Sequence, residues 1–170
     1  MSGSSWGGGG IAPLRNASPR HVRITGTVVG LGAGTVLALA RWLDPSPAGV
    51  GTHQQLGLAP CTLLTLTGWP CPMCGMTTTF ALMAHGRPTE ALWNQPFGVV
   101  LFGVTVGLAL AGAVDASFRA GWIGRTVGML ARHEHLLATV FLVGLGMGWA
   151  WKAARVHPEV FHLVGLALLG

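Results

Sequence analysis

Apolar residues gather in three long runs, and polar residues collect between them. The runs cover residues 22–43, 97–114 and 135–151 and contain 22, 18 and 17 residues. A helix rises about 1.5 Å per residue, so each run covers about 25 Å or more of the roughly 30 Å hydrocarbon core of a bilayer. The pattern therefore predicts three transmembrane helices.

The ends of the second and third runs carry further cues. Pro96 suits the first helical position, and Asn94 or Gln95 just before it can cap the helix start. The third run is the shortest. We expect the interfacial Trp149, Trp151 and Lys152 to finish its crossing.

Small residues recur at every fourth position of each run, on one face of the predicted helix. They are Gly26, Gly30, Gly34 and Ala38 in the first run, Gly103, Gly107 and Ala111 in the second, and Gly144 and Gly148 in the third. Such small-xxx-small faces let helix backbones approach closely in a membrane. They can pack the spans against one another, against another membrane protein or in a homo-oligomer.

A fourth apolar stretch is interrupted at its centre. No Lys, Arg, Asp or Glu occurs between Asp44 and Arg87, yet the residues GWPCP at 68–72 break the helical pattern. In this pattern Cys71 fits the N-cap of the following helix and Gly86 the residue just past its end. A broken backbone would leave unpaired polar groups in lipid. We therefore expect residues 59–86 to form a re-entrant or interfacial hairpin, although their length would also permit a fourth crossing.

Composition assigns the protein to a class. Of the 170 residues, 51% are hydrophobic and only 9% are charged, against about 25% charged in soluble proteins. This balance predicts an all-α integral membrane protein that contacts the lipid bilayer. The net charge of +5 does not indicate nucleic-acid binding, because the ten basic residues are scattered around the apolar runs and do not form a stripe.

The ends of the chain differ from the membrane domain expected at residues 22–156. Residues 1–21 are rich in Gly and Ser and predict a disordered tail, whereas residues 157–170 form an apolar tail too short to span. An alternative for the first run is a cleaved signal peptide, because basic residues precede it and the Ala38–Ala40 segment resembles a cleavage site. The run is longer than most signal sequences, which favours a membrane span.

The basic residues also predict an orientation in a bacterial inner membrane. Six lie on the side of the N-terminus and of the loop between the second and third spans: Arg15, Arg20, Arg23, Arg119, Arg125 and Arg132. Four lie on the opposite side: Arg41, Arg87, Lys152 and Arg155. The positive-inside rule then places the cysteine hairpin and the C-terminus outside.

The cysteines carry the candidate chemistry, and the first interpretation is a redox pair. Cys71 and Cys74 are separated by two residues, with Pro72 second in the motif. A cysteine at a helix N-terminus has a lowered pKa, and a second cysteine one turn later can resolve a mixed disulfide. The strand–helix–strand units of thioredoxin-like enzymes are missing from the sequence.

The second interpretation is a metal site for zinc or copper. Cys61 can join Cys71 and Cys74 as a third ligand if the hairpin folds back at residues 68–70, and His53 is a candidate fourth ligand. Met73 and Met76 would suit Cu(I). The third interpretation is that the thiols only pack a tight turn, because free cysteine is often buried and inert.

Other candidate functional motifs in the sequence are weak. We expect Thr77, Thr78 and Thr79 to satisfy backbone carbonyls of their own helix. The five acidic residues are isolated, and no phosphate-binding glycine loop or Ser/His/Asp arrangement is evident. The sequence therefore indicates a binding or structural membrane module and leaves enzymatic activity open.

The cysteine region resembles a family of small bacterial membrane proteins, the domain of unknown function family 2752. The resemblance rests on CPMCGMT at residues 71–77, on Gly86, on the short Ala91–Leu92 helix, and on NQP at residues 94–96. Many relatives carry Arg directly after the signature Thr, where this chain has Thr78. The resemblance implies a membrane hairpin followed by a span, and it implies no activity.

Overall fold

The computed structural model describes residues 18–159, and over this range the chain forms helices and no β-strand. Three helical stretches are long and apolar enough to cross a membrane. The first is α1 (Pro19–Trp42) and the second is α5 (Pro96–Phe118). The third runs from α6 (Trp122–Leu130) through a short 3₁₀ segment, η3 (Ala131–His133), into α7 (Glu134–Val156). The prediction of an all-α protein with three spans is confirmed.

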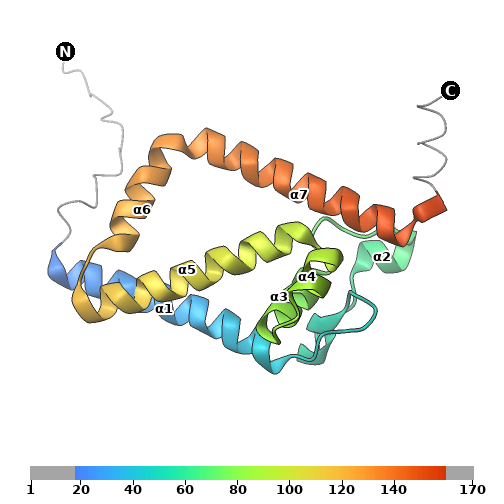
Figure 1. Ribbon diagram of the computed structural model, residues 1–170, viewed down its shortest axis with the longest axis horizontal. Helices are drawn as coiled ribbons and strands as arrows, with labels where there is room; N and C mark the ends of the chain where they lie inside the picture. The colour runs from blue at the N-terminus through green and yellow to red at the C-terminus, as the bar shows by residue number, and fades with distance from the viewer. Residues whose placement is uncertain (1–17, 160–170) are drawn as a thin grey trace, which may run out of the picture.

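Helices α1 and α5 run side by side, α7 is inclined to them, and the short elements gather at one end (Figure 1). Helix α1 crosses α5 closely, whereas α7 runs along the other side of α5 and approaches it near the α7 C-terminus. The end at the right of Figure 1 carries η2 (Thr52–Leu56), α2 (Thr62–Thr67), α3 (Met76–Ala84) and α4 (Pro88–Asn94). We call it the cysteine end. The opposite end carries the turn from α5 into α6.

Glycine allows the close contact between α1 and α5. A Cβ built on Gly112 would lie only 2.5 Å from the Cα of Gly30 and 2.7 Å from the carbonyl oxygen of Gly26. A Cβ on Gly26 would in turn meet the Asp115 side chain at 2.7 Å. The first two glycines of the predicted α1 face therefore pack as expected.

The rest of the predicted faces do not pack in the described residues. Gly34 on α1 and Gly103 and Gly107 on α5 have no neighbour within 4 Å of a built Cβ. Residues four positions apart on a helix are offset by about 40° around its axis, so a row of them turns gradually away from the partner helix. The buried residues of α1 are instead Gly26, Ala33 and Ala40, spaced by seven, the period that keeps one seam facing a partner.

Helix α7 packs on α5 through Phe97. A Cβ on Gly144 would lie 2.5 Å from the Phe97 ring, and one on Gly148 would lie 3.0 Å from its Cβ. The Phe97 and Phe141 rings also meet edge-to-face at 5.5 Å. The predicted Gly144–Gly148 face therefore accommodates one aromatic side chain.

Asp115 closes the opposite end of the bundle. Its carboxylate oxygens accept hydrogen bonds from the backbone N–H groups of Trp122 (2.8 Å) and Ile123 (2.9 Å), which begin α6. The side chain is almost completely buried. A carboxylate at a helix start satisfies free N–H groups and opposes the helix dipole. Asp115 thus connects α6 to the end of α5.

Several predicted boundaries shift. Helix α1 begins at Pro19, three residues before the predicted start, because Ser18 caps it by accepting from the His21 N–H (3.4 Å). Residues 18–21 are therefore not tail; residues 1–17 and 160–170, which hold most of both predicted tails, lie outside the described range. Helix α7 continues to Val156, past the predicted end at residue 151.

Five tryptophans lie at the cysteine end, and all are partly exposed. They are Trp42, Trp69, Trp93, Trp149 and Trp151. Tryptophan is enriched where membrane meets water, because its ring is apolar and its N–H is polar. Such a group of tryptophans is typical of a membrane surface, where we expect the cysteine end to lie.

Candidate functional site

The cysteine turn lies between α2 and α3. Helix α2 ends at Gly68, whose φ of 75° turns the chain back, and α3 begins only at Met76. The Cys74 N–H donates to the Cys71 carbonyl (2.9 Å), which closes a tight turn over residues 71–74. The chain then passes through Gly75 at φ 86°, a conformation that favours glycine.

This geometry corrects the predicted position of Cys71. The N-cap of α3 is Gly75, so Cys71 lies four residues before it and does not begin a helix. The left-handed conformation of Gly75 interrupts the helical path between the cysteines and α3. At the other end of α3 the prediction is confirmed. Gly86 follows the helix at φ 71°, and the Arg87 N–H returns to the Leu82 carbonyl (2.9 Å).

The three cysteines meet in one cluster. The sulfur atoms of Cys61, Cys71 and Cys74 all lie within 4.8 Å of one another. Cys61 directly precedes α2, and the fold-back over residues 68–70 brings the other two cysteines to it. The Cys71 N–H also donates to the Cys74 sulfur (3.2 Å). Cys74 is buried, whereas Cys61 and Cys71 are half-buried.

The three thiols are not equivalent. The backbone N–H of Leu64 in α2 lies near the Cys61 sulfur and lowers the pKa of this thiol to about 7. The contact is too loose to count as a capping hydrogen bond of α2. Burial, followed by hydrogen bonds that the Cys74 thiol donates to the Cys71 and Cys61 sulfurs, raises the pKa of Cys74 to about 12. The sequence predicts that a helix start stabilises the thiolate of Cys71. In the structure a helix start stabilises the thiolate of Cys61 instead.

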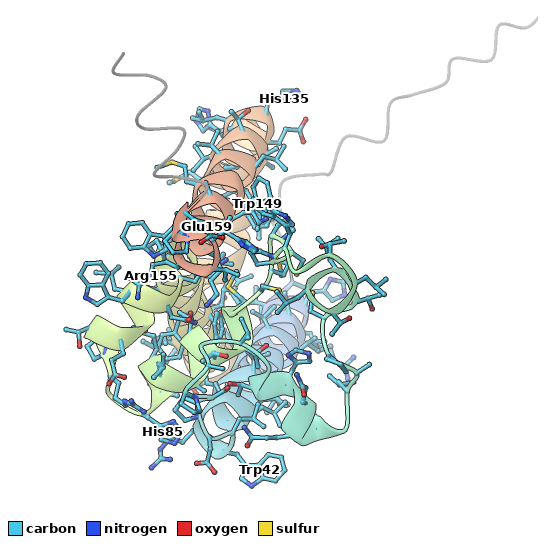
Figure 2. The ribbon with its side chains drawn as sticks, turned by 90° about the vertical axis from the view of Figure 1, so that its right-hand side faces the viewer. Trp42, His85, His135, Trp149, Arg155 and Glu159 are labelled. Atoms are coloured by element: carbon cyan, nitrogen blue, oxygen red, sulfur yellow. The ribbon has the colours of Figure 1, made fainter. Side chains whose placement is uncertain are left out.

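Trp149 of α7 and His157, the residue directly after α7, hold the loop that leads into the cysteine turn. The indole Nε1–H of Trp149 donates to the Pro70 carbonyl (2.7 Å), and His157 Nε2 lies 3.0 Å from the Gly68 carbonyl oxygen. The rings of Trp69 and His157 pack with centroids 4.6 Å apart. Figure 2 looks at this end of the bundle, where Trp149 on α7 lies beside the cysteine region. The last span is therefore part of the site's support.

A polar junction fixes Gly75. Its carbonyl accepts from Asn94 Nδ2 (3.0 Å), which also donates to the Thr79 hydroxyl (2.9 Å). Asn94 Oδ1 accepts from the Lys152 ammonium (2.7 Å), which donates in addition to the Gly49 carbonyl (2.9 Å). A Cβ on Gly75 would lie 2.9 Å from that carbonyl oxygen. The junction therefore requires glycine after Cys74.

Gln95 and the threonines serve tertiary contacts. Gln95 is fully buried at the N-cap position of α5, but its amide donates to the Pro72 carbonyl (3.2 Å) and does not cap the helix. The predicted capping by Asn94 or Gln95 side chains is therefore wrong. Thr78 shares a hydrogen bond with Thr52 (2.9 Å), so neither it nor Thr79 makes the expected bond to its own helix.

The remaining candidate ligands lie elsewhere. His53 Nε2 lies 3.1 Å from the Ala59 carbonyl oxygen, and His53 is not a member of the sulfur cluster. Met73 is exposed, and the Met76 sulfur lies towards Gly98 of α5. Within residues 18–159, the group of His, Cys, Asp or Glu side chains that could hold a metal ion consists of the three cysteines.

The comparison with known families identifies this region. Residues 61–109 match the family "Protein of unknown function (DUF2752)". The resemblance noted in the sequence is confirmed over this stretch. The DUF2752 segment begins at Cys61 and ends inside α5, so it contains all three cysteines together with Asn94 and Gln95, and it covers less than a third of the chain. No curated protein and no solved structure matches the chain.

Sequence reasoning missed the residues of α7 that support the site. Trp149 and Lys152 were read as interfacial anchors, and His157 was placed in the C-terminal tail. They contact Pro70, Gly49 and Gly68, which are 79, 103 and 89 residues away in the chain. The one local signal was the pair of amide side chains, Asn94 and Gln95, just before Pro96, since polar groups at a span end usually have a partner.

Proposed function

We propose that the cysteine end is a metal-binding site in which Cys61, Cys71 and Cys74 hold one thiophilic ion, zinc or Cu(I). The observation that carries this proposal is the convergence of three sulfur atoms from two chain segments within 4.8 Å. A disulfide pair needs only two cysteines, and packing needs none in particular. Three thiols at one point match the ligand preference of soft metals.

The geometry needs only a small adjustment. Zn–S bonds of about 2.3 Å in a tetrahedron place the sulfurs about 3.8 Å apart, so the sulfurs move together by less than about 1 Å on binding. The half-buried Cys61 and Cys71 leave the ion reachable from the membrane surface. With three protein ligands, zinc would keep a fourth position for water or an exchangeable ligand, and Cu(I) would be three-coordinate.

Metal binding also agrees with the unequal thiols. Thiolates are the metal ligands, so the lowered pKa of Cys61 favours it as the first donor. Burial raises the pKa of the Cys74 thiol, so a bound cation would have to displace its proton.

A second candidate function is thiol–disulfide exchange. The closed Cys71–Cys74 turn, with the Cys71 N–H on the Cys74 sulfur, favours a bond between these two cysteines. Forming that disulfide removes two protons and two electrons, which pass to an exchanging disulfide of a partner protein. In this function Cys61 would be dispensable, which separates the two candidates.

The test is the state of the cysteines in full-length protein purified without reductant. Elemental analysis measures bound metal, and intact mass before and after reduction measures disulfide. We expect one metal ion per chain, lost in Cys61→Ser and Cys71→Ser and retained in Met73→Leu, an exposed neighbour in the same turn.

The other outcomes are equally distinct. A two-proton mass deficit that disappears on reduction, without metal and unchanged by Cys61→Ser, would establish the redox function. Three free thiols that alkylate readily in metal-free protein would contradict both functions and leave packing.

We further propose that the protein lies in a bacterial inner membrane with the cysteine end outside. The six-to-four distribution of basic residues between the two sides supports this orientation. In a variant without native cysteines, a new cysteine at Gln54 should react with an impermeant maleimide in intact cells, and one at Ala131 should not. The reverse pattern would place the cysteines in the cytoplasm.

A further inference from the structure

A cavity of about 510 Å³ lies against the polar junction formed by Gly49, Asn94 and Lys152. Its walls come from residues 45–49, from α4 and from the last turns of α7. Three cationic side chains line it, Arg87, Lys152 and Arg155, with one carboxylate, Glu90. Arg155 extends from the end of α7 on the side of α4 (Figure 2). The cavity therefore has an excess of positive charge at the membrane surface.

The carboxylate is already paired with one of the cations. Arg87 donates to Glu90 through Nε (2.6 Å) and through Nη2 (2.5 Å), a two-pronged contact within one turn. Lys152 and Arg155 have no carboxylate partner among residues 18–159. Two positive charges in the cavity wall thus lack a counter-charge from the protein described.

Lys152 is the strongest indication that the cavity binds an anion, because this residue is only 5% exposed. Its ammonium donates to the Gly49 carbonyl and to Asn94 Oδ1, which are both neutral. An ammonium has three N–H donors, so one donor is not used by these two bonds. Burying a charge beside neutral acceptors alone is unfavourable, and a bound anion would offset that cost.

Arg155 is placed to bind the same anion. Its guanidinium carbon lies 5.4 Å from the centre of the Trp93 ring, which also lines the cavity, and this ring is paired with Trp151 at 5.8 Å. This contact restrains the guanidinium over the ring, and within residues 18–159 its N–H groups form no hydrogen bond. These N–H groups match the oxygens of a phosphate group.

We propose that this cavity binds the phosphate group of an anionic ligand, through Lys152 and Arg155. The volume exceeds what a single carboxylate would fill, and the tryptophans place the cavity at the level of lipid headgroups. The phosphate comes either from an anionic phospholipid or from a soluble phosphate compound. The proposal does not depend on a metal at the cysteines.

Binding is tested with the full-length protein in two experiments. Native mass spectrometry, in detergent with equimolar phosphatidylglycerol and phosphatidylcholine, measures retained lipid. Calorimetric titration with inorganic phosphate measures binding of the free anion. We expect saturable binding of one phosphatidylglycerol, inorganic phosphate or both, with no retention of phosphatidylcholine.

Two exposed positions give variants with opposite expected effects. Arg155→Gln should weaken binding about tenfold, as expected for loss of charge-assisted hydrogen bonds. Glu90→Gln should strengthen it severalfold, because it removes the negative charge and frees Arg87. Both side chains are exposed, so neither change should prevent folding. The matched control is Arg125→Gln on α6 at the opposite end, which should change binding less than twofold.

The outcomes separate the sources of phosphate. Retained phosphatidylglycerol without binding of inorganic phosphate identifies a lipid headgroup, and binding of inorganic phosphate alone identifies a soluble ligand. Absence of saturable binding in both experiments overturns the proposal. Equal effects of Arg155→Gln and Arg125→Gln also overturn it, because they indicate general attraction of anions.

Discussion

The indole of Trp149 in α7 donates its hydrogen bond to the carbonyl of Pro70, 2.7 Å away, directly before the first cysteine of the turn. The third span thus contacts the cysteine site without supplying a ligand. Groups that position a site from outside its ligand set often determine how rigid it is.

Trp149→Phe should loosen the cysteine turn while keeping most of the ring packing. Loss of one partly buried hydrogen bond costs about 1 kcal/mol, so we expect Cys74 in reduced, metal-free protein to react with a small maleimide about fivefold faster. The matched control is Trp151→Phe, which removes a similar bond to the Trp93 carbonyl. Equal rates in the two variants would show that the Trp149 bond does not restrain the turn.

Gly30→Leu should destabilise the pair of α1 and α5 much more than Gly32→Leu. Gly30 faces the backbone of Gly112, whereas a side chain on Gly32 meets nothing within 4 Å. Forcing a side chain into a close helix contact costs about 1–3 kcal/mol. Thermal unfolding in detergent measures the difference. Equal loss of stability would mean that α1 and α5 do not pack at these glycines.

The thiols should alkylate at different pH. In reduced, metal-free protein, half of Cys61 should be thiolate at about pH 7, and its reaction should rise through that pH. Cys74, whose pKa is raised to about 12, should stay protonated and slow until far more alkaline pH. Peptide mapping after short iodoacetamide pulses gives the profile of each cysteine. A profile in which Cys74 reacts before Cys61 would reverse the assignment.

His157 should make the support of the turn dependent on pH. Its contacts with the Gly68 carbonyl and with Glu159 raise its pKa above the usual 6.5. A raised pKa means that this stabilisation is complete below pH 6.5 and is lost as pH rises through the higher value. Thermal stability of the wild type should therefore fall over that range, and the fall should be smaller in His157→Gln. Identical profiles would remove the role assigned to His157.

Thr78→Val should destabilise the protein, and Thr77→Val should have little effect. Thr78 is buried and hydrogen-bonded to Thr52, whereas no hydrogen bond is formed by the half-buried Thr77 side chain within the described structure. The first change leaves a buried hydroxyl without one partner, at a cost of about 1–3 kcal/mol. Chemical denaturation of both variants tests this. A larger effect of Thr77→Val would contradict the arrangement of α3.

Local patterns predicted the parts of this fold that depend on neighbouring residues. The three apolar runs, the break at residues 68–70 and the end of α3 at Gly86 follow from hydropathy and from backbone preferences of Gly and Pro. The meeting of Cys61 with Cys71 and Cys74 could be anticipated as one outcome of that break. Its geometry could not, because it depends on the left-handed turns at Gly68 and Gly75.

Contacts between distant segments could not be read from the sequence. The spacing of four indicated Gly34 and Gly103 as contact residues, but the angle between α1 and α5 selects Gly26, Gly30 and Gly112. Cys71 suited an N-cap because Pro72 follows it, yet Gly75 takes that position, where Asn94 binds its carbonyl. In both cases a tertiary contact decided between local alternatives of similar energy.

The long separation between the cysteine turn and its supports has a consequence for biosynthesis. The ribosome adds residues from the N-terminus, so all three cysteines leave it well before Trp149, Lys152 and His157. During that interval the turn lacks its supports, and the thiols are open to oxidation or to a metal donor. The turn gains these supports only when α7 is in place. Chains stalled before residue 134 should therefore show faster thiol labelling than completed ones.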